Sequence, residues 1–285
     1  MAAGIGRIGI WSMELRFGDR ALAASAAAEL DALGFGALWV PGGMGGPLLD
    51  DLDFLLGATG SATIATGILN VWKHEPAEVA AWFAALSDDR KARVLLGLGV
   101  SHSHIIGEAW AKPLAVMRDY LDRLDAAGMA RDHLCLAALG PKMQQMAAAR
   151  TAGAHPYLVT AEHTAEARAA MGPDALLAPE LGVVLESDPA AARALARGAL
   201  NHYLEYPNYR NSWLRQGFSE SDLADGGSDQ LVDALFAWGS LDDIAARVAA
   251  HHAAGADHVC LQLVHGAGLD INAALPGWRE LARLI

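Results

Sequence analysis

The residues best suited to catalysis in this sequence follow the ends of apolar runs. His74 lies near the end of the stretch from Ser61 to Pro76, SATIATGILNVWKHEP, where a β-branched run gives way to polar and aromatic residues. His102 follows a second apolar run, ARVLLGLGVS. Histidine titrates near neutral pH, so both residues are candidates for a catalytic acid or base, or for a contact with substrate. A solvated loop histidine is the simpler interpretation of each one.

The motifs of several other catalytic classes are missing from the sequence. No GxSxG and no Cys–His arrangement supports nucleophilic hydrolysis. No HxxxH or CxxC spacing supports a metal site, so we predict none. The run GLGVSHS lacks the glycine spacing of a Rossmann dinucleotide fingerprint. Cys135 and Cys260 each lie in an apolar run, which favours buried small side chains over a disulfide or a nucleophile.

The composition excludes further classes of protein. The 285 residues are 53% hydrophobic and carry a formal net charge of -12. No basic cluster indicates a nucleic-acid binder, and no apolar run reaches the roughly 18 to 20 residues of a membrane span. The first residues, MAAGIGRIGIW, show no signal-peptide pattern. These features predict a soluble, cytoplasmic protein whose partner is a small-molecule substrate.

Apolar, strand-like segments alternate with helical patterns along the chain. Eight segments are predicted as strands, at 7–12, 36–42, 62–70, 92–101, 133–139, 154–159, 175–186 and 257–264. Pro76 and Pro141 stand at the first-turn positions of two of the intervening helices. The alternation continues without a shift in composition, which predicts one domain over residues 1–285 with a (β/α)8 TIM-barrel fold. An open doubly wound sheet is the alternative.

One connection is much longer than the others. Residues 205–227, EYPNYRNSWLRQGFSESDLADGG, are polar and aromatic and precede the last strand. A connection of this length predicts a lid or an insertion. Helices are expected after it at 230–238 and 241–254, the second with Ser240 and Asp243 as a capping box.

In a (β/α)8 barrel the carboxyl ends of the strands meet at one mouth. Glycine recurs at these ends, which suits a flat ligand pressed against the backbone. The residues expected to contact such a ligand are Trp11, Gly42, Gly43, Gly67, Gly99, Val100, Ser101, Leu139 and Thr160. Gly140 and Pro141 lead into a helix whose first N–H groups, together with Lys142, could bind a phosphate. A Gly-Pro turn that merely starts a helix explains these residues equally well.

Three segments resemble a known family. The most specific patterns are ALGPKM, within LAALGPKMQQMAAARTAGAHPYLVT, and GILNxxxxxP, within ATGILNVWKHEPAEVAAWFAAL. The third segment, GSLDDIAARVAAHHAAGADHVCLQLV, is similar to the family's last helix–strand unit. Together they resemble the luciferase-like flavin-dependent oxidoreductases, in their F420-dependent branch. The resemblance implies a TIM barrel that holds a flavin or 5-deazaflavin in its mouth and passes a hydride at the ring.

The resemblance also implies roles for individual residues. Residues 140–142 (Gly-Pro-Lys) match the loop that receives the coenzyme phosphate. Residues 67–68 (Gly-Ile) match a bulge with a non-prolyl cis peptide behind the ring, and Asn70 matches the residue under the ring edge. Residues 99–102 (Gly-Val-Ser-His) match the loop that lines the coenzyme tail.

The sequence departs from the family pattern after the second strand. Many F420-dependent members carry Asp there, often with His, whereas this chain reads Val40-Pro41-Gly42-Gly43. The resemblance therefore assigns no acid or base at this position. His74 or His102 could take its place.

From these features we expect an oxidoreductase that transfers a hydride between coenzyme F420 and a small organic substrate. Trp11 and Trp72 are expected beside the ring, although plain packing explains them equally well, and Tyr209 and Arg210 are expected near the substrate. An FMN-dependent monooxygenase and a non-catalytic flavin-binding relative are the alternatives. Family members often form dimers, so a homodimer is a further expectation.

Overall fold

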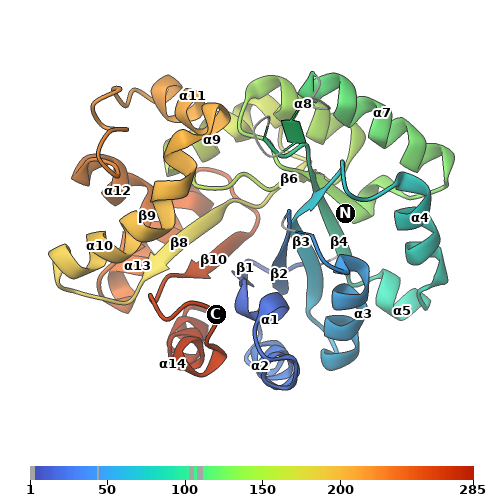
Figure 1. The fold of residues 1–285 in the computed structure, drawn as a ribbon, viewed down its shortest axis with the longest axis horizontal. Coiled ribbons are helices and arrows are strands. Elements are labelled where there is room, and N and C mark those ends of the chain that lie inside the picture. Colours follow the sequence, from blue (N-terminus) through green and yellow to red (C-terminus); the bar gives the residue numbers. More distant parts are fainter. Residues whose placement is uncertain (1–3, 44, 103–105, 108–111) are drawn as a thin grey trace.

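The structure is a computed structural model that describes residues 4–43, 45–102, 106–107 and 112–285. Within these residues, ten parallel strands form one sheet in the order β7-β6-β5-β4-β3-β2-β1-β10-β8-β9. Helices surround the strands on all sides (Figure 1). The strands are β1 (Ile8–Trp11), β2 (Ala37–Gly42), β3 (Thr63–Asn70), β4 (Val94–Gly99), β5 (Leu134–Leu136), β6 (Gly153–Ala154), β7 (Leu176–Leu177), β8 (Glu180–Val184), β9 (Phe236–Trp238) and β10 (Val259–Leu263).

The helices follow the strands in sequence, as the alternation predicts. They are α1 (Glu14–Phe17), α2 (Arg20–Ala32), α3 (Leu48–Ala58), α4 (Pro76–Ala85), α5 (Asp88–Lys91), α7 (Pro113–Ala126), α8 (Pro141–Arg150), α9 (Ala161–Met171), α10 (Pro189–Leu200), α11 (Pro207–Arg215), α12 (Asp229–Leu235), α13 (Leu241–Ala253) and α14 (Ile271–Leu281). Short 3-10 helices are η2 (Arg131–His133), η3 (Asn201–Glu205) and η4 (Ala282–Leu284). The predicted α/β class with a parallel sheet is confirmed.

The sheet curls because β7 and β8 are consecutive pieces of one chain segment. Only Ala178 and Pro179 separate them, yet β7 pairs with β6 while β8 pairs with β10. The N–H of Ala178 donates to the carbonyl of Ala154, and the N–H of Cys260 donates to the carbonyl of Pro179. The segment 176–184 therefore has β6 on one side and β10 on the other.

Alternate residues of the strands pack into two different hydrophobic clusters, one on each face of the sheet. Leu38, Ile64 and Leu96 belong to the large cluster that joins the strands to the helices. Their neighbours face the other way, into a second cluster that includes Trp39, Ala65, Leu95, Cys135 and Cys260. Strands buried on both faces have nearly continuous apolar sequences, which is the pattern that the chain shows. Both cysteines are free and buried, as predicted.

The predicted helix starts and caps are largely confirmed. Pro76 and Pro141 are the first residues of α4 and α8. Ser240 and Asp243 form the capping box of α13, and the two hydrogen bonds of the box are both present. These caps satisfy N–H groups that a helix start would otherwise leave unpaired.

Several sequence-based boundaries are wrong, among them a strand expected at 154–159 that pairs only as β6 and a strand expected at 175–186 that is divided into β7 and β8. The helix expected at 230–238 ends at Leu235, and Phe236–Trp238 form β9 beside β8. The cause is a tertiary contact, because the ring of Phe236 fills the space over Gly182, where an added Cβ would lie 2.5 Å from Cδ1. The strand expected at 133–139 is also shorter, because only Leu134–Leu136 pair as β5, and the following residues line a cavity instead.

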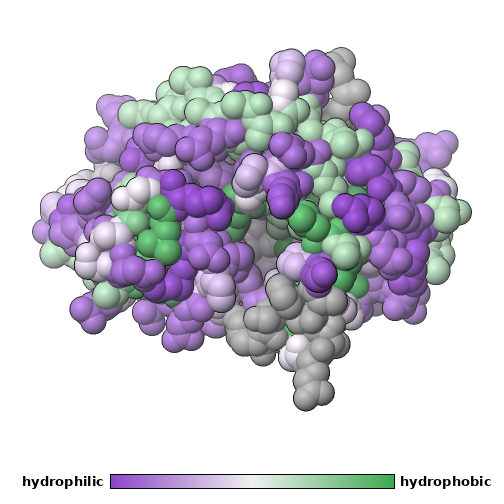
Figure 2. Space-filling model, turned by 90° about the horizontal axis from the view of Figure 1, so that it is seen from above, coloured by the Kyte–Doolittle hydropathy of each residue, from purple (hydrophilic) through white to green (hydrophobic). Residues whose placement is uncertain are grey.

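Hydrophilic residues dominate the face shown in Figure 2, with smaller hydrophobic areas between them. Among the described residues, no helix is long and apolar enough to cross a membrane.

Candidate functional site

A cavity of about 450 Å³ lies beyond the carboxyl ends of β3, β4 and β5, and α11 forms one of its walls. It brings together eight of the residues predicted from the sequence, namely Ile68, Gly99, Val100, Ser101, His102, Leu139, Gly140 and Tyr209. Its volume falls within the range of small-ligand pockets. The ends of parallel strands are also where α/β enzymes place their sites.

A bulge in β3 forms one side of the cavity. The peptide bond between Gly67 and Ile68 is cis, which confirms the expectation drawn from the resemblance. The pairing register shifts between Thr66 and Leu69 against β4, and a matching shift occurs in β2 between Val40 and Gly42. The bulge directs Ile68 toward the cavity, whereas Gly67 does not line it.

Gly67 packs behind the bulge, where no side chain fits. A Cβ added there would overlap the indole nitrogen of Trp11 and lie 2.9 Å from Nε2 of His155. His155 lines the cavity, and its Nδ1 lies 2.7 Å from the carbonyl oxygen of Ala178. Burial lowers the pKa of His155 to about 4, so the ring is neutral at neutral pH. Trp11 and His155 thus support the bulge from inside the sheet.

The loop after β4 forms the next part of the wall. Ser101 adopts a left-handed backbone with φ of 57°, which is uncommon for a residue other than glycine and often marks a functional site. The Trp72 indole donates a hydrogen bond of 2.8 Å to the carbonyl of Val100, so Trp72 holds this loop without lining the cavity. Nδ1 of His102 lies 3.0 Å from Oδ1 of Asn208, on α11. The ring of His102 also packs on Tyr206, with 4.2 Å between centroids.

The start of α8 provides a candidate anion site. Gly140 is the N-cap residue and offers no side chain to the first-turn N–H groups. Among the described residues, an added Cβ on Gly140 would meet one atom within 4 Å, Nη2 of Arg215 at 3.9 Å. Arg215 comes from α11, lines the cavity and donates a hydrogen bond of 3.2 Å to the carbonyl of Leu139. Lys142, the cation predicted for this position, is exposed and outside the lining.

The connection predicted as a lid or insertion, residues 205–227, begins at the last residue of η3 and carries α11, which is tied to the mouth of the sheet. The Trp213 indole donates to the carbonyl of Leu158 over 3.1 Å. The hydroxyl of Thr160 donates to Oε1 of Gln216 over 2.9 Å, so Thr160 anchors this segment and does not line the cavity. Arg210 donates to the carbonyl of Leu204 and pairs with Glu220, which also leaves it outside the lining.

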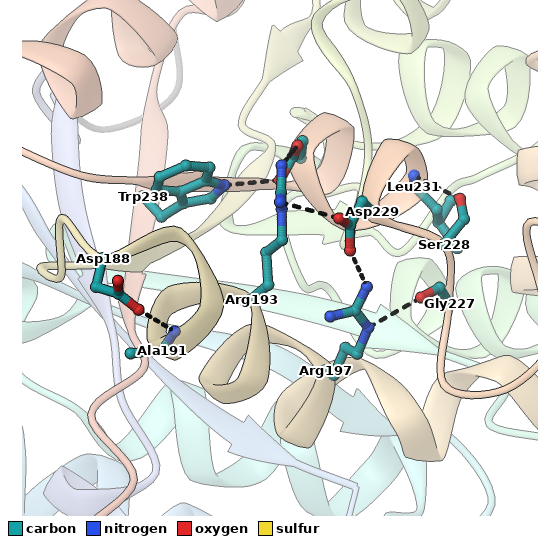
Figure 3. Close-up of polar contacts among 10 residues, drawn as sticks. Asp188, Ala191, Arg193, Arg197, Gly227, Ser228, Asp229, Leu231 and Trp238 are labelled. Atoms are coloured by element: carbon teal, nitrogen blue, oxygen red, sulfur yellow. Dashed lines mark hydrogen bonds and ion pairs between the residues drawn. The ribbon is translucent and has the colours of Figure 1, made fainter.

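Helices α10 and α12 hold the two ends of this connection together (Figure 3). Arg193 pairs with Asp229 at 2.9 Å, and Arg197 donates to the carbonyl of Gly227 at 3.0 Å while pairing with Asp229. Arg193 also pairs with Asp233. These contacts fix the residues that enter and leave the segment that carries α11.

The sequence reasoning missed a half-buried tyrosine that lines the cavity and a buried glutamate that holds the backbone next to it. Tyr157 lines the cavity and donates a hydrogen bond of 2.7 Å to Oε1 of Gln262. Glu180 is 1% exposed, and its Oε2 accepts the N–H of Leu158 at 3.0 Å. Burial raises the pKa of Glu180 to about 8. An acidic residue inside the apolar run APELGVV was the available signal.

The remaining predicted residues lie near the cavity without lining it. His74 is half-buried in the loop after β3, its carbonyl accepts the hydroxyl of Tyr120 at 2.9 Å, and burial lowers the pKa of its ring. Oδ1 of the buried Asn70 accepts the N–H of Trp72. Gly42 packs against the bulge, with an added Cβ 2.6 Å from the carbonyl oxygen of Ile68. Gly43 and Pro141 are also outside the lining.

Two further polar clusters lie beside the strand ends of β1 and β2. Ser12 donates to Oε2 of Glu14, and Oε1 of Glu14 lies 3.0 Å from Nε2 of His265. The buried Arg16 donates to the carbonyl of Pro41 at 2.6 Å and pairs with Asp51 at 3.0 Å. These clusters hold the loops after β1, β2 and β10. No group of three His, Cys, Asp or Glu gathers as metal ligands in the described part of the chain.

A curled parallel sheet with a cis bulge in its third strand and a cavity at the strand ends defines an α/β protein of the luciferase-like fold. The model of the luciferase-like monooxygenase family matches residues 18–128. This match confirms the resemblance to that family for this part of the chain. A search of curated proteins gave no match.

Solved structures extend the likeness over nearly the whole chain. An F420-dependent secondary alcohol dehydrogenase in complex with an F420-acetone adduct has a TM-score of 0.75 at 15% identity, with 98% of each chain covered. The coenzyme F420 dependent tetrahydromethanopterin reductase from Methanopyrus kandleri has a TM-score of 0.70 at 14% identity, covering 97% of this chain and 98% of that one.

An FMN-containing structure is similar to almost the same degree. The oxygenating constituent of 3,6-diketocamphane monooxygenase from Pseudomonas putida, in complex with FMN, has a TM-score of 0.68 at 14% identity. The match covers 99% of this chain and 96% of that one. At such identities the likeness shows the fold and does not distinguish the two coenzymes.

Proposed function

We propose that the protein is an oxidoreductase that transfers a hydride between coenzyme F420 and a small organic substrate. The observation that carries this proposal is that Ile68 of the cis bulge and Gly140 at the start of α8 line one cavity of about 450 Å³. A tricyclic ring with a phosphate tail needs a flat apolar support and an anion site within reach of each other. The protein supplies both in one place.

The bulge and the loops after β4 and β5 fit the ring. Ile68 and Gly99 pack directly on each other, and together with Ala137 they give an apolar wall. The deazaflavin, when bound, supplies the hydride chemistry, and the protein positions the ring and excludes water. His102 and Tyr209 line the same cavity from the β4 loop and α11, where they can contact the substrate.

The start of α8 fits the phosphate. Its first-turn N–H groups have no side-chain cap, and the positive end of the helix dipole favours an anion there. The guanidinium of Arg215 lies beside Gly140 and adds a fixed positive charge. We therefore assign the phosphate to Gly140, the following N–H groups and Arg215.

The scaffold that fits this role is a complete (β/α)8 barrel. The segment 176–184 is hydrogen-bonded to β6 and to β10, so we infer that β7 and β8 act as a single seventh strand. Counted in this way, eight strands form the ring and β9 is an addition outside it. A closed ring holds the strand ends in fixed positions around one mouth.

An FMN-dependent monooxygenase is the second candidate. The specific observation in its favour is that an FMN-bound structure shares the fold at nearly the same TM-score as the F420-dependent neighbours. The same ring wall and anion site suit FMN, which also carries one phosphate. Direct measurement of coenzyme binding distinguishes the two candidates.

Titration of the purified protein with each coenzyme tests the proposal. We expect quenching of F420 fluorescence with a dissociation constant in the micromolar range, and a hydride transfer to or from F420 with a panel of small carbonyl compounds and alcohols. A micromolar response to FMN without any response to F420 would replace the first candidate by the second. No response to either coenzyme would contradict both.

A further inference from the structure

Tyr157 lines the cavity, and its hydroxyl group is held by two residues outside the lining. It donates to Oε1 of Gln262 at 2.7 Å, and the hydroxyl of Tyr203 on η3 lies 3.4 Å away, directed at the oxygen of Tyr157. Tyr203 is partly exposed, and its hydroxyl is the neighbour of the Tyr157 hydroxyl on the side of η3. The ring of Tyr157 packs against Trp11, with 5.7 Å between centroids. The hydroxyl therefore has a fixed position between Gln262 and Tyr203.

The backbone beside Tyr157 is held in an uncommon conformation. Leu158 has a φ of 53°, in the left-handed region that leucine rarely adopts. Its N–H donates to Oε2 of Glu180, and its carbonyl accepts the indole N–H of Trp213. Glu180 and Trp213 are both buried, and together they satisfy both polar groups of this residue. An uncommon backbone that is held from two sides is typical of functional positions.

The surroundings keep the Tyr157 hydroxyl protonated. The titratable groups that face it are Glu180, Tyr203 and Tyr209, and burial raises the pKa of each, with Glu180 at about 8. Burial likewise raises the pKa of Tyr157 well above its usual value. A protonated phenol of this kind is a weak acid toward water but a sufficient one toward an alkoxide, which is far more basic.

We propose that Tyr157 is the catalytic acid of the reaction, and that the substrate is a small aldehyde or ketone, because a carbonyl group takes a hydride at carbon and a proton at oxygen. This inference rests on the proposed function and names its substrate class and proton donor. The oxygen of the substrate takes the place of Gln262 as the acceptor of the Tyr157 hydroxyl. Glu180 acts as a positioning residue through the N–H of Leu158.

In the direction of reduction, the carbonyl carbon receives a hydride, with its electron pair, from the reduced coenzyme, which is thereby oxidised. The electrons of the carbonyl π bond move to the oxygen, and this oxygen takes the proton of Tyr157. The phenolic O–H bond breaks and an alcohol O–H bond forms. Tyr203 then returns a proton to the oxygen of Tyr157 and regains its own from solvent. Oxidation of the alcohol follows the same steps in reverse.

The test compares Tyr157→Phe with the wild-type protein and with Tyr120→Phe. The phenylalanine keeps the ring packing and removes only the hydroxyl. Tyr120→Phe is the matched control, because it removes a hydroxyl that bonds the backbone of His74 outside the cavity. We expect Tyr157→Phe to bind F420 with unchanged affinity and to transfer hydride roughly 100-fold or more slowly than the wild type. Tyr120→Phe should remain within about twofold in rate.

A second variant separates a chemical role from a structural one. Tyr157→Ala leaves space for an added aromatic molecule, and we expect phenol to restore hydride transfer while toluene does not. The assignment would be overturned if Tyr157→Phe transferred hydride at the wild-type rate. It would also be overturned if phenol and toluene restored hydride transfer in Tyr157→Ala equally well. If Tyr157→Ala does not fold, the rate and coenzyme affinity of Tyr157→Phe decide alone, and a parallel loss of both overturns the assignment. A wild-type protein that binds neither coenzyme would instead overturn the proposed function, and this inference with it.

Discussion

Gly67 shows how a single residue controls the geometry of the site. Gly67 precedes the cis peptide bond. The indole of Trp11 and the imidazole of His155 occupy the space into which a side chain at this position would extend. Both aromatic side chains are nearly inaccessible, at 5% and 1% exposed. Neither can move outward without disturbing the packed interior of the sheet. The bulge that carries Ile68 therefore depends on a position that accepts only glycine.

Gly67→Ala tests this dependence. The added methyl group would overlap Trp11, so we expect a loss of about 1–3 kcal/mol in the free energy of unfolding, together with weaker F420 binding. The measurement is urea unfolding followed by a fluorescence titration of coenzyme. Gly198→Ala is the control, because Gly198 is exposed within α10 with nothing within 4 Å of an added Cβ. That variant should gain about 0.5–1 kcal/mol. Equal stabilities for the two variants would contradict the account of Gly67.

At the scale of elements, the site depends on the approach of α11 to the start of α8. These helices come from distant parts of the chain, and Arg215 joins them through the carbonyl of Leu139. Trp213 and Gln216 tie the same segment to residues 158–160. The segment that carries α11 thus forms a wall that brings a positive charge to the start of α8. The N–H groups and the guanidinium can form the proposed anion site only while this packing holds.

Arg215→Met tests the assembled anion site. Methionine keeps much of the length of the side chain and removes its charge, so we expect F420 affinity to fall roughly ten- to hundredfold, with little change in stability. Fluorescence titration at low and high salt measures the effect, and the wild type should lose affinity with salt more steeply than the variant. Arg283→Met removes an exposed charge paired with Glu280 elsewhere and is the control. Unchanged affinity in Arg215→Met would remove the guanidinium from the phosphate site.

At the scale of the whole molecule, buried titratable groups couple the fold to pH. Burial lowers the pKa of His155, His251 and His258 to about 4 each. Burial raises the pKa of Glu180 to about 8. The histidines are buried without charge, and so is the glutamate. In the unfolded chain all four side chains are charged at intermediate pH. Unfolding therefore adds protons to the histidines and removes one from Glu180, so the two kinds of residue change stability with pH in opposite directions.

The signs predict a maximum of stability near pH 6.5. As pH falls from about 6.5 to about 4, the unfolded chain binds protons at the three histidines that the folded protein does not bind, so stability falls steeply. As pH rises from about 4.5 to about 8, the unfolded chain loses the proton that Glu180 keeps when folded, so this group lowers stability more gently. Urea unfolding at a series of pH values measures both limbs. Glu180→Gln should flatten the decline between about pH 6.5 and 8, and a decline that persists in this variant would contradict the role of Glu180.

The sequence predicted the parts of the fold that local signals encode. Alternating apolar segments indicated the parallel sheet, Pro141 marked the start of α8, and the pattern around Gly67 indicated the cis bulge through its family likeness. The parts that it missed depend on contacts between distant segments. Arg215 and Tyr157 line one cavity only because α11 packs over the strand ends, and no local sequence signal predicts this packing. Phe236 leaves its helix because Gly182, on another strand, offers a space for its ring.

The walls of the cavity come from segments that are far apart in the sequence. Ile68 and Gly99 belong to the first part of the chain, whereas Tyr209 and Arg215 lie beyond residue 205. During synthesis on a ribosome, the early strands emerge long before the segment that completes the pocket. A nascent chain that ends before residue 207 contains the residues of the bulge but not those of its opposite wall. Any ligand that contacts both walls can therefore bind only after α11 has been synthesised.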